Sequence, residues 1–207
     1  MTRCVYYVGL YAGNSEYLEV LAIRCTLVHM TSENPSSADN QQERFCSVSS
    51  ATGHYLAGFA DGEGSFNISF RSRNDYRSPW KVSACFNISQ KEKEILEVCR
   101  QHLNCGTLRS RPDGVWYYEV NMLKDLQQNV IPFFQKFPFL SQKKKKDFAT
   151  FCAIVSLLKD GKHLFEAGVR EILDLRRSMN NGGKRKFSEE QILNQYRKSS
   201  ETIRQTP

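Results

Sequence analysis

Residues 56–64 read Leu-Ala-Gly-Phe-Ala-Asp-Gly-Glu-Gly (LAGFADGEG), an apolar, small-residue stretch that ends in two acids set among glycines. The pattern predicts a helix over about 52–63. The C-terminus of a helix carries a partial negative charge, so Asp61 and Glu63 lie at its unfavourable end. We therefore expect a positive group close to these two carboxylates.

Two alternating segments follow this helix. In residues 65–73 the side chains of Phe66, Ile68 and Phe70 point one way and polar side chains point the other, which is typical of a half-buried strand. Residues 81–89 alternate in the same manner. Both segments are therefore predicted to be strands of an antiparallel sheet with one apolar face.

The rest of the chain predicts further elements in a simple order. We expect helices over about 91–103, 123–137, 143–159, 163–178 and 188–203, and a hairpin of 107–111 and 115–121 around a Pro-Asp-Gly turn. Capping boxes are predicted at Ser89 with Glu92 and at Ser188 with Gln191. The inner stripe of the helix over 91–103 is expected to be Ile95, Val98, Cys99 and His102. The predicted fold class is α+β, in the order α-β-β-α-β-β-α with extra C-terminal helices.

The 207 residues divide by composition and charge. Residues 1–47 include a polar run at 31–44 and are predicted to be an N-terminal extension or linker. Residues 48–207 are predicted to be one domain, with its C-terminal helices from about 143. Residues 1–50 hold 3 Lys or Arg and 5 Asp or Glu, whereas 51–207 hold 26 and 17. A basic domain of this kind favours nucleic acid or an anionic surface as its partner.

Cysteine usage and hydropathy indicate the compartment. The seven cysteines are odd in number and contain no Cys-x-x-Cys pair, which argues against a disulfide framework. No apolar run is long enough to span a bilayer. We therefore expect an intracellular protein of a bacterial cytoplasm or an organelle, neither secreted nor bound to a membrane.

The polar side chains of the predicted strands share the open face of the sheet. Arginines and asparagines on such a surface suit the DNA major groove, because Arg pairs with guanine and Asn with adenine. Lysines at 143–146 add a basic run that suits backbone phosphate. The predicted DNA-binding residues are Asn67, Ser69, Arg71, Arg73, Lys81, Ser83, Asn87, Arg109, Arg111 and Lys144.

LAGFADGEG, followed directly by an alternating strand, resembles the motif of the LAGLIDADG homing endonucleases, and the order of elements over about 50–200 is similar to the core of that family. A second copy of the motif is not found downstream. The resemblance is therefore to the single-motif, homodimeric branch. It implies an antiparallel, saddle-shaped sheet and a protein that cuts both strands of a long, pseudo-palindromic DNA site. It also implies that an intron encodes the protein.

The resemblance also implies roles for the residues of the motif. Ala57, Gly58, Asp61 and Gly62 would line the contact between two copies of the helix, where small residues allow close approach. Glu63, with the carbonyl of Gly62, would bind Mg²⁺ or Mn²⁺ at the scissile phosphate. Asp61 is also open to pairing with a cation.

Two further catalytic residues follow from the resemblance. Gln90, at the end of the second strand, corresponds to a residue that positions water, and Lys143 corresponds to the active-site lysine. Four successive lysines leave the choice among them open. The alternative interpretation is an intron RNA maturase, or a DNA-binding protein of the same fold that does not cleave.

Overall fold

The computed structural model describes residues 48–73, 79–182 and 185–204, without the side chains of 181 and 197–204. The predicted extension over 1–47 lies outside the described residues. The strands are β1 Gly64–Ser72, β2 Trp80–Gln90, β3 Thr107–Ser110 and β4 Trp116–Val120. The α-helices are α2 Ser50–Glu63, α3 Lys93–Leu103, α4 Leu123–Asp125, α5 Ile131–Lys136, α6 Gln142–Lys159, α7 Glu166–Arg177 and α8 Glu189–Arg204. A π-helix, η1 Leu126–Val130, and two 3₁₀ segments, η2 Lys162–Leu164 and η3 Met179–Gly182, complete the described elements.

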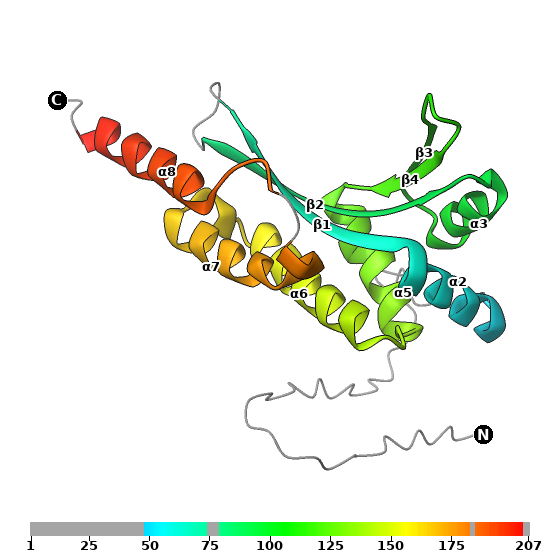
Figure 1. Ribbon diagram of the computed structural model, residues 1–207. Helices are drawn as coiled ribbons and strands as arrows, with labels where there is room; N and C mark the ends of the chain where they lie inside the picture. The colour runs from blue at the N-terminus through cyan, green and yellow to red at the C-terminus, as the bar shows by residue number, and fades with distance from the viewer. Residues whose placement is uncertain (1–47, 74–78, 183–184, 205–207) are drawn as a thin grey trace, which may run out of the picture. The chain divides into compact units, whose positions relative to one another are not determined.

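The described strands form one antiparallel sheet in the order β1-β2-β4-β3. Its longest pairing runs from Gly64 opposite Ile88 to Ser72 opposite Trp80, so β1 and β2 form a long hairpin. Figure 1 shows helices α5 and α6 beneath the curved sheet, while the described helices leave its other face open. The predicted α+β class, the α-β-β-α-β-β-α order and the additional C-terminal helices are confirmed.

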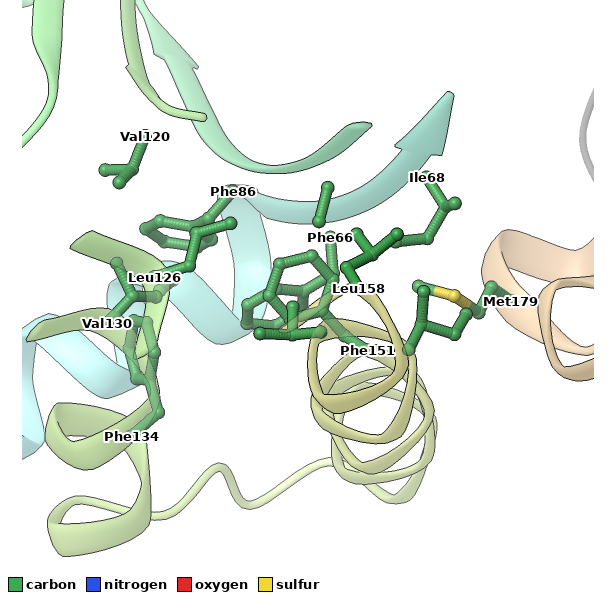
Figure 2. Packing of buried hydrophobic residues seen from close by; sticks show 14 of the residues in the cluster. Phe66, Ile68, Phe86, Val120, Leu126, Val130, Phe134, Phe151, Leu158 and Met179 are labelled. Atoms are coloured by element: carbon green, nitrogen blue, oxygen red, sulfur yellow. The ribbon is translucent and has the colours of Figure 1, made fainter. Parts of the chain in front are cut away.

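The apolar face of the sheet forms one wall of the core. Alternate residues of β1, β2 and β4 are buried, as their sequence period requires. Phe66 is 1% exposed, and its ring lies 4.9 Å from that of Phe151 on α6 and 5.1 Å from that of Phe86. Figure 2 shows these rings between the sheet and the helices below it, with Phe134 on one side and Leu158 on the other.

The C-terminal helices are attached to the far end of the hairpin. The indole of Trp80 donates a hydrogen bond of 3.1 Å to the carbonyl of Ile192 on α8. The predicted capping box at the start of α8 is present, because the Ser188 N–H donates to Gln191 and the Gln191 N–H donates to Ser188. No helix in the described ranges is both long enough and apolar enough to cross a membrane.

Two predicted helices differ from the structure in detail. The segment over 123–137 is not one regular helix, because α4 and α5 are separated by the π-helical turn η1. Pro132 in the first turn of α5 lacks an N–H and cannot continue a regular α-helical ladder. Helix α3 begins after Glu92 without a side-chain cap, so the predicted box at Ser89 is wrong.

The buried stripe of α3 is also shifted from the predicted one. Its buried residues are Leu96, Cys99 and Leu103. Ile95 and Val98 only flank the core. Apolar residues are adjacent in sequence at 95–96 and at 98–99, so either member of each pair could face the core, and packing selects Leu96 and Cys99.

Candidate functional site

The end of α2 passes into β1 without a loop. Gly64 begins the strand, and its N–H closes the helix by donating to the carbonyl of Ala60. A Cβ on Gly64 would lie 2.6 Å from that carbonyl oxygen, so only glycine permits this junction. Glu63 is therefore fixed by its backbone at the point where helix and sheet meet, with its side chain exposed.

The surroundings of Glu63 suit a cation. The last turn of α2 holds no basic residue, and the helix C-terminus adds partial negative charge. The described residues contain no cluster of three or more His, Cys, Asp or Glu side chains. The carboxylate of Glu63 and the exposed carbonyl end at Gly62 are hard oxygen donors, and Mg²⁺ takes few protein ligands and keeps several waters. This chemistry fits the predicted metal ligands.

Asp61 binds the segment just before α6. Its carboxylate accepts hydrogen bonds from the Leu140 N–H at 3.0 Å, the Ser141 N–H at 2.8 Å and the Ser141 hydroxyl. Partial burial alone would raise the pKa of Asp61, but these bonds and nearby Lys144 outweigh it and lower the pKa. Asp61 is thus bound within its own chain, at the start of α6.

The basic run 143–146 lies in the first turns of α6, and its members differ in exposure. Lys144 is half-buried, and its Nζ donates to the carbonyl of Gly64. Burial lowers the pKa of Lys144, although Asp61, Asp147 and Glu63 act in the opposite direction. Lys143 is exposed beside it. The lysine that contacts the Glu63 junction is therefore Lys144, whereas Lys143 points into solvent.

Gln90 lies at the same end of the sheet as Glu63. It is the last residue of β2 and pairs with Trp116 of β4. Because Gly64 is opposite Ile88, Gln90 extends the strand by two residues beyond the helix–strand junction. Its side-chain carbonyl accepts a hydrogen bond of 2.8 Å from the Lys91 N–H.

The predicted DNA-binding side chains of the strands occupy the open face. Arg71 is opposite Lys81 and Ser69 is opposite Ser83, so β1 and β2 carry one continuous polar surface. Arg109, on β3, and Arg111, just after it, are exposed on the same phase of the alternation. The predicted residues on and next to the strands therefore share the face opposite to the core, which Figure 1 shows uncovered, whereas Lys144 belongs to α6, beneath the sheet.

Glu119 on β4 was missed by the sequence analysis. Its carboxylate accepts a hydrogen bond of 3.5 Å from the Cys85 thiol and lies 4.0 Å from the Arg109 guanidinium. Burial, with Glu119 close by, raises the pKa of Cys85 to about 12, so this thiol is protonated at neutral pH. The run of aromatic residues at 116–118 hid the phase of this strand, in which Tyr118 is buried and Tyr117 and Glu119 face outward.

One side of α2 is open. Gly58 and Gly62 are exposed, and a Cβ on either would meet no atom within 4 Å. Tyr55 on the same side is 61% exposed, and Leu140, whose N–H binds Asp61, is 84% exposed. Ala57 differs from the prediction, because it is 2% exposed and packs into the core of its own domain.

Comparison with known proteins identifies the class to which this fold and site belong. Residues 56–155 match the family described as LAGLIDADG endonuclease. The archaeal intron-encoded homing endonuclease I-Vdi141I, in a structure complexed with DNA, has a TM-score of 0.65 and 27% identity, covering 72% of this chain and 97% of that one.

Curated relatives agree with this class. The chain is 33% identical to homing endonuclease I-ApeII of Aeropyrum pernix, over 67% of this chain and 86% of that protein. It is 32% identical to probable intron-encoded endonuclease 2 of Neurospora crassa, over 62% of this chain but only 29% of that longer protein. The chain belongs to the LAGLIDADG homing endonuclease family.

Proposed function

We propose that this protein is a site-specific homing endonuclease that binds double-stranded DNA as a homodimer and hydrolyses one phosphodiester bond in each strand with Mg²⁺ or Mn²⁺. The observation that carries the proposal is the position of Glu63. It lies where α2 enters a sheet with an open polar and basic face. A site of cleavage and a surface for DNA are thus joined through one peptide bond, between Glu63 and Gly64.

The open sheet face is proposed to lie in the major groove. Its exposed arginines and lysine supply donors for guanine and for phosphate, while its amides suit adenine. Arg71 and Lys81 lie toward one end of the long hairpin, and Arg109 lies on β3, at the opposite edge of the same sheet face. A surface of this breadth supports recognition of several base pairs in each half of the site.

Assembly of two copies is proposed to occur through the open side of α2. Gly58 and Gly62 leave room for a second helix, and exposed apolar side chains at Tyr55 and Leu140 flank them. Helices approach closely where such small residues face each other. A two-fold axis at α2 brings together two Glu63 residues, one for each DNA strand, and makes a pseudo-palindromic target the natural partner.

At each cleavage position Glu63 and the Gly62 carbonyl are proposed to hold the metal. A divalent ion so bound lowers the pKa of water and stabilises charge on the phosphate. Gln90, at the same end of the sheet, is proposed to orient the attacking water through its amide. An exposed lysine such as Lys143 is free to approach phosphate, whereas Lys144 is engaged with Gly64.

The test uses a library of randomised duplex DNA, selected by binding to the full chain without divalent metal. The selected duplexes are then incubated with Mg²⁺ or Mn²⁺ and the wild-type protein or Glu63→Gln. We expect the wild type to cut both strands, and Glu63→Gln to bind equally well but to cut about 10²- to 10³-fold more slowly.

The matched control is Glu94→Gln, which removes a charge from an exposed residue of α3 far along the chain. It should cut at the wild-type rate. Wild-type protein that binds a selected duplex tightly and never cuts it with either metal would contradict the nuclease and favour a binding protein of the same fold. Tight binding to DNA as a monomer would contradict the two-fold arrangement.

A further inference from the structure

A polar network connects α6 to the edge of the sheet. Asp147 is the one buried charged side chain among the described residues, with 5% exposure. Its carboxylate accepts a hydrogen bond of 3.2 Å from the Asn180 N–H. Met179, just before Asn180, is buried in the same core cluster as Ile68 of β1 (Figure 2). The short η3 segment is thereby anchored against β1.

Asn180 contacts β1 through its side chain. Its Nδ2 donates to the carbonyl of Phe66 at 2.8 Å and to Oδ1 of Asn67 at 3.2 Å. The backbone at Asn180 has a φ of 51°, a left-handed conformation that asparagine and glycine tolerate best. The left-handed backbone at Asn180 and the hydrogen bond from its N–H to the buried Asp147 therefore place the Asn180 amide beside the edge strand β1.

The orientation of the Asn180 amide follows from its partners. A backbone carbonyl has no hydrogen, so the Phe66 oxygen accepts only from the Nδ2 side of Asn180. The same Nδ2 also faces Asn67. Because an amide nitrogen donates and does not accept, Asn67 turns its Oδ1 toward the Nδ2 of Asn180. The Nδ2 of Asn67 is left on the other side, where it donates to the Ser65 hydroxyl at 3.1 Å. One carbonyl thus determines the direction of two amides.

Asn67 keeps part of its hydrogen-bonding capacity for a ligand. A primary amide has two N–H donors and an oxygen with two lone pairs, and the internal bonds use one of each. One N–H and one lone pair remain beyond these two bonds, on a residue in the outward phase of β1. Adenine presents the complementary pair in the major groove, an acceptor at N7 and a donor at N6.

We propose that Asn180 is a positioning residue that holds the Asn67 amide in the orientation that reads adenine. The inference rests on the proposed function, since it requires the open face to lie on double-stranded DNA. It gives the segment after α7 a role in target choice although Asn180 itself lies at the edge of the sheet. Asp147 acts one step further away, through the backbone of Asn180.

The experiment compares the base preferences of the wild type, Asn67→Ala, Asn180→Gly and Asn180→Asp on the duplex library described above. Glycine removes the amide and retains the left-handed backbone. Aspartate has nearly the same shape but cannot donate to Phe66, so the Asn67 amide should turn over. Arg109→Ala, on another strand, is the control for a change at a different base pair.

We expect adenine to be favoured by about 5- to 150-fold at one position of each half-site in the wild type. Asn67→Ala, Asn180→Gly and Asn180→Asp should each lose that preference at the same position and keep the preferences elsewhere. The double variant Asn67→Ala with Asn180→Gly should be no more relaxed than Asn67→Ala alone, because both changes remove one interaction. Thermal unfolding of each variant identifies any that does not fold.

The results separate this inference from the function on which it rests. A wild-type protein that selects no specific duplex overturns the DNA recognition and this inference together. Specific selection in which Asn180→Gly and Asn180→Asp keep the adenine preference that Asn67→Ala loses overturns the inference alone. A uniform loss of affinity at every base pair, with no change in preference, also overturns it, because that result indicates a purely structural role.

Discussion

Asp61 binds Ser141 through two hydrogen bonds, one from its N–H at 2.8 Å and one from its hydroxyl. Ser141 is the N-cap of α6, and its hydroxyl also accepts from the Lys144 N–H at 3.3 Å. An acid at the unfavourable end of α2 is therefore at the favourable, positive end of α6. The two acids of the motif separate in role: Asp61 fixes the helix that carries the lysines, and Glu63 remains available.

Replacement of Asp61 by Ala should destabilise the fold. The change leaves the N–H groups of Leu140 and Ser141, just before α6, without their acceptor, and loss of these bonds costs about 1–2 kcal/mol. Urea unfolding followed by circular dichroism measures the free energy. Asp160→Ala, which removes an exposed carboxylate at the other end of α6, is the control and should change stability by less than about 0.5 kcal/mol.

The contribution of Asp61 should also depend on pH. Its pKa is lowered in the folded state, so the unfolded chain takes up the proton more readily. The stabilisation is present above the unfolded pKa of about 3.9 and is lost as the pH falls through the lower folded value. The difference in unfolding free energy between wild type and Asp61→Ala should therefore shrink below about pH 4. A difference that grows on acidification would contradict this assignment.

Much of the fold could be predicted because its signals are local. Alternation in β1 and β2 identified the buried and open faces, and the Ser188–Gln191 capping box located the start of α8. The π-helical turn before Pro132 could not be predicted, because the apolar pattern of this segment is compatible with an α-helix as well as with a π-helix. The phase of β4 depends on which of three adjacent aromatic residues the core accepts, and that is decided by packing.

The geometry of the candidate site could be predicted from the sequence only where one continuous segment determines it. The helix–strand junction at Glu63 is local, but the partner of Asp61 lies 80 residues later and carries no pairing signal. Among successive lysines, each residue turns by about 100° around the helix, so the N-cap at Ser141 decides which one faces β1. In the sequence, the segment that contains Asn180 resembles an ordinary connection between two helices. Its contacts to β1 are made only in the folded structure.

Phe66 should be among the costliest core residues to truncate. It is 1% exposed and packs against rings of both β2 and α6. Phe66→Ala removes these contacts and leaves a cavity, so we expect a loss of about 3–5 kcal/mol in urea unfolding. Phe165→Ala removes the same ring from a site that is 66% exposed and should change stability by less than about 0.5 kcal/mol. Equal losses for the two variants would contradict the packing.

Two glycines of the motif should respond in opposite ways to substitution. Gly58→Leu places a good helix former where the fold leaves open space, so the monomer should fold at least as stably as the wild type. If α2 is the dimer interface, the larger side chain should raise the dimer dissociation constant at least tenfold in analytical ultracentrifugation. An unchanged dimer would show that the two copies meet elsewhere.

Gly64→Ala is the counterpart inside the fold. Its Cβ would lie 2.6 Å from the Ala60 carbonyl oxygen, which belongs to the helix backbone and cannot rotate away. The junction between α2 and β1 should shift, and we expect a loss of about 1–3 kcal/mol in stability together with slower cleavage. Gly58→Ala, at an open position inside α2, is the control for altered glycine entropy and should not lower stability.

The lysines of α6 can be separated by stability and cleavage measured on the same variants. Lys144→Met leaves the Gly64 carbonyl without its donor, so urea unfolding should show a loss of about 1–3 kcal/mol. Lys143→Met changes an exposed side chain and should alter stability by less than about 0.5 kcal/mol. In cleavage, the two lysines should differ in the opposite sense. If Lys143 assists cleavage, Lys143→Met should bind the selected duplex normally and cut it about 10²-fold more slowly. Lys145→Met, also exposed, is the control for loss of positive charge alone. Wild-type cleavage by Lys143→Met, with slow cleavage by a folded Lys144→Met, would assign the catalytic lysine to position 144 and show that the helix phase set by Ser141 selects it.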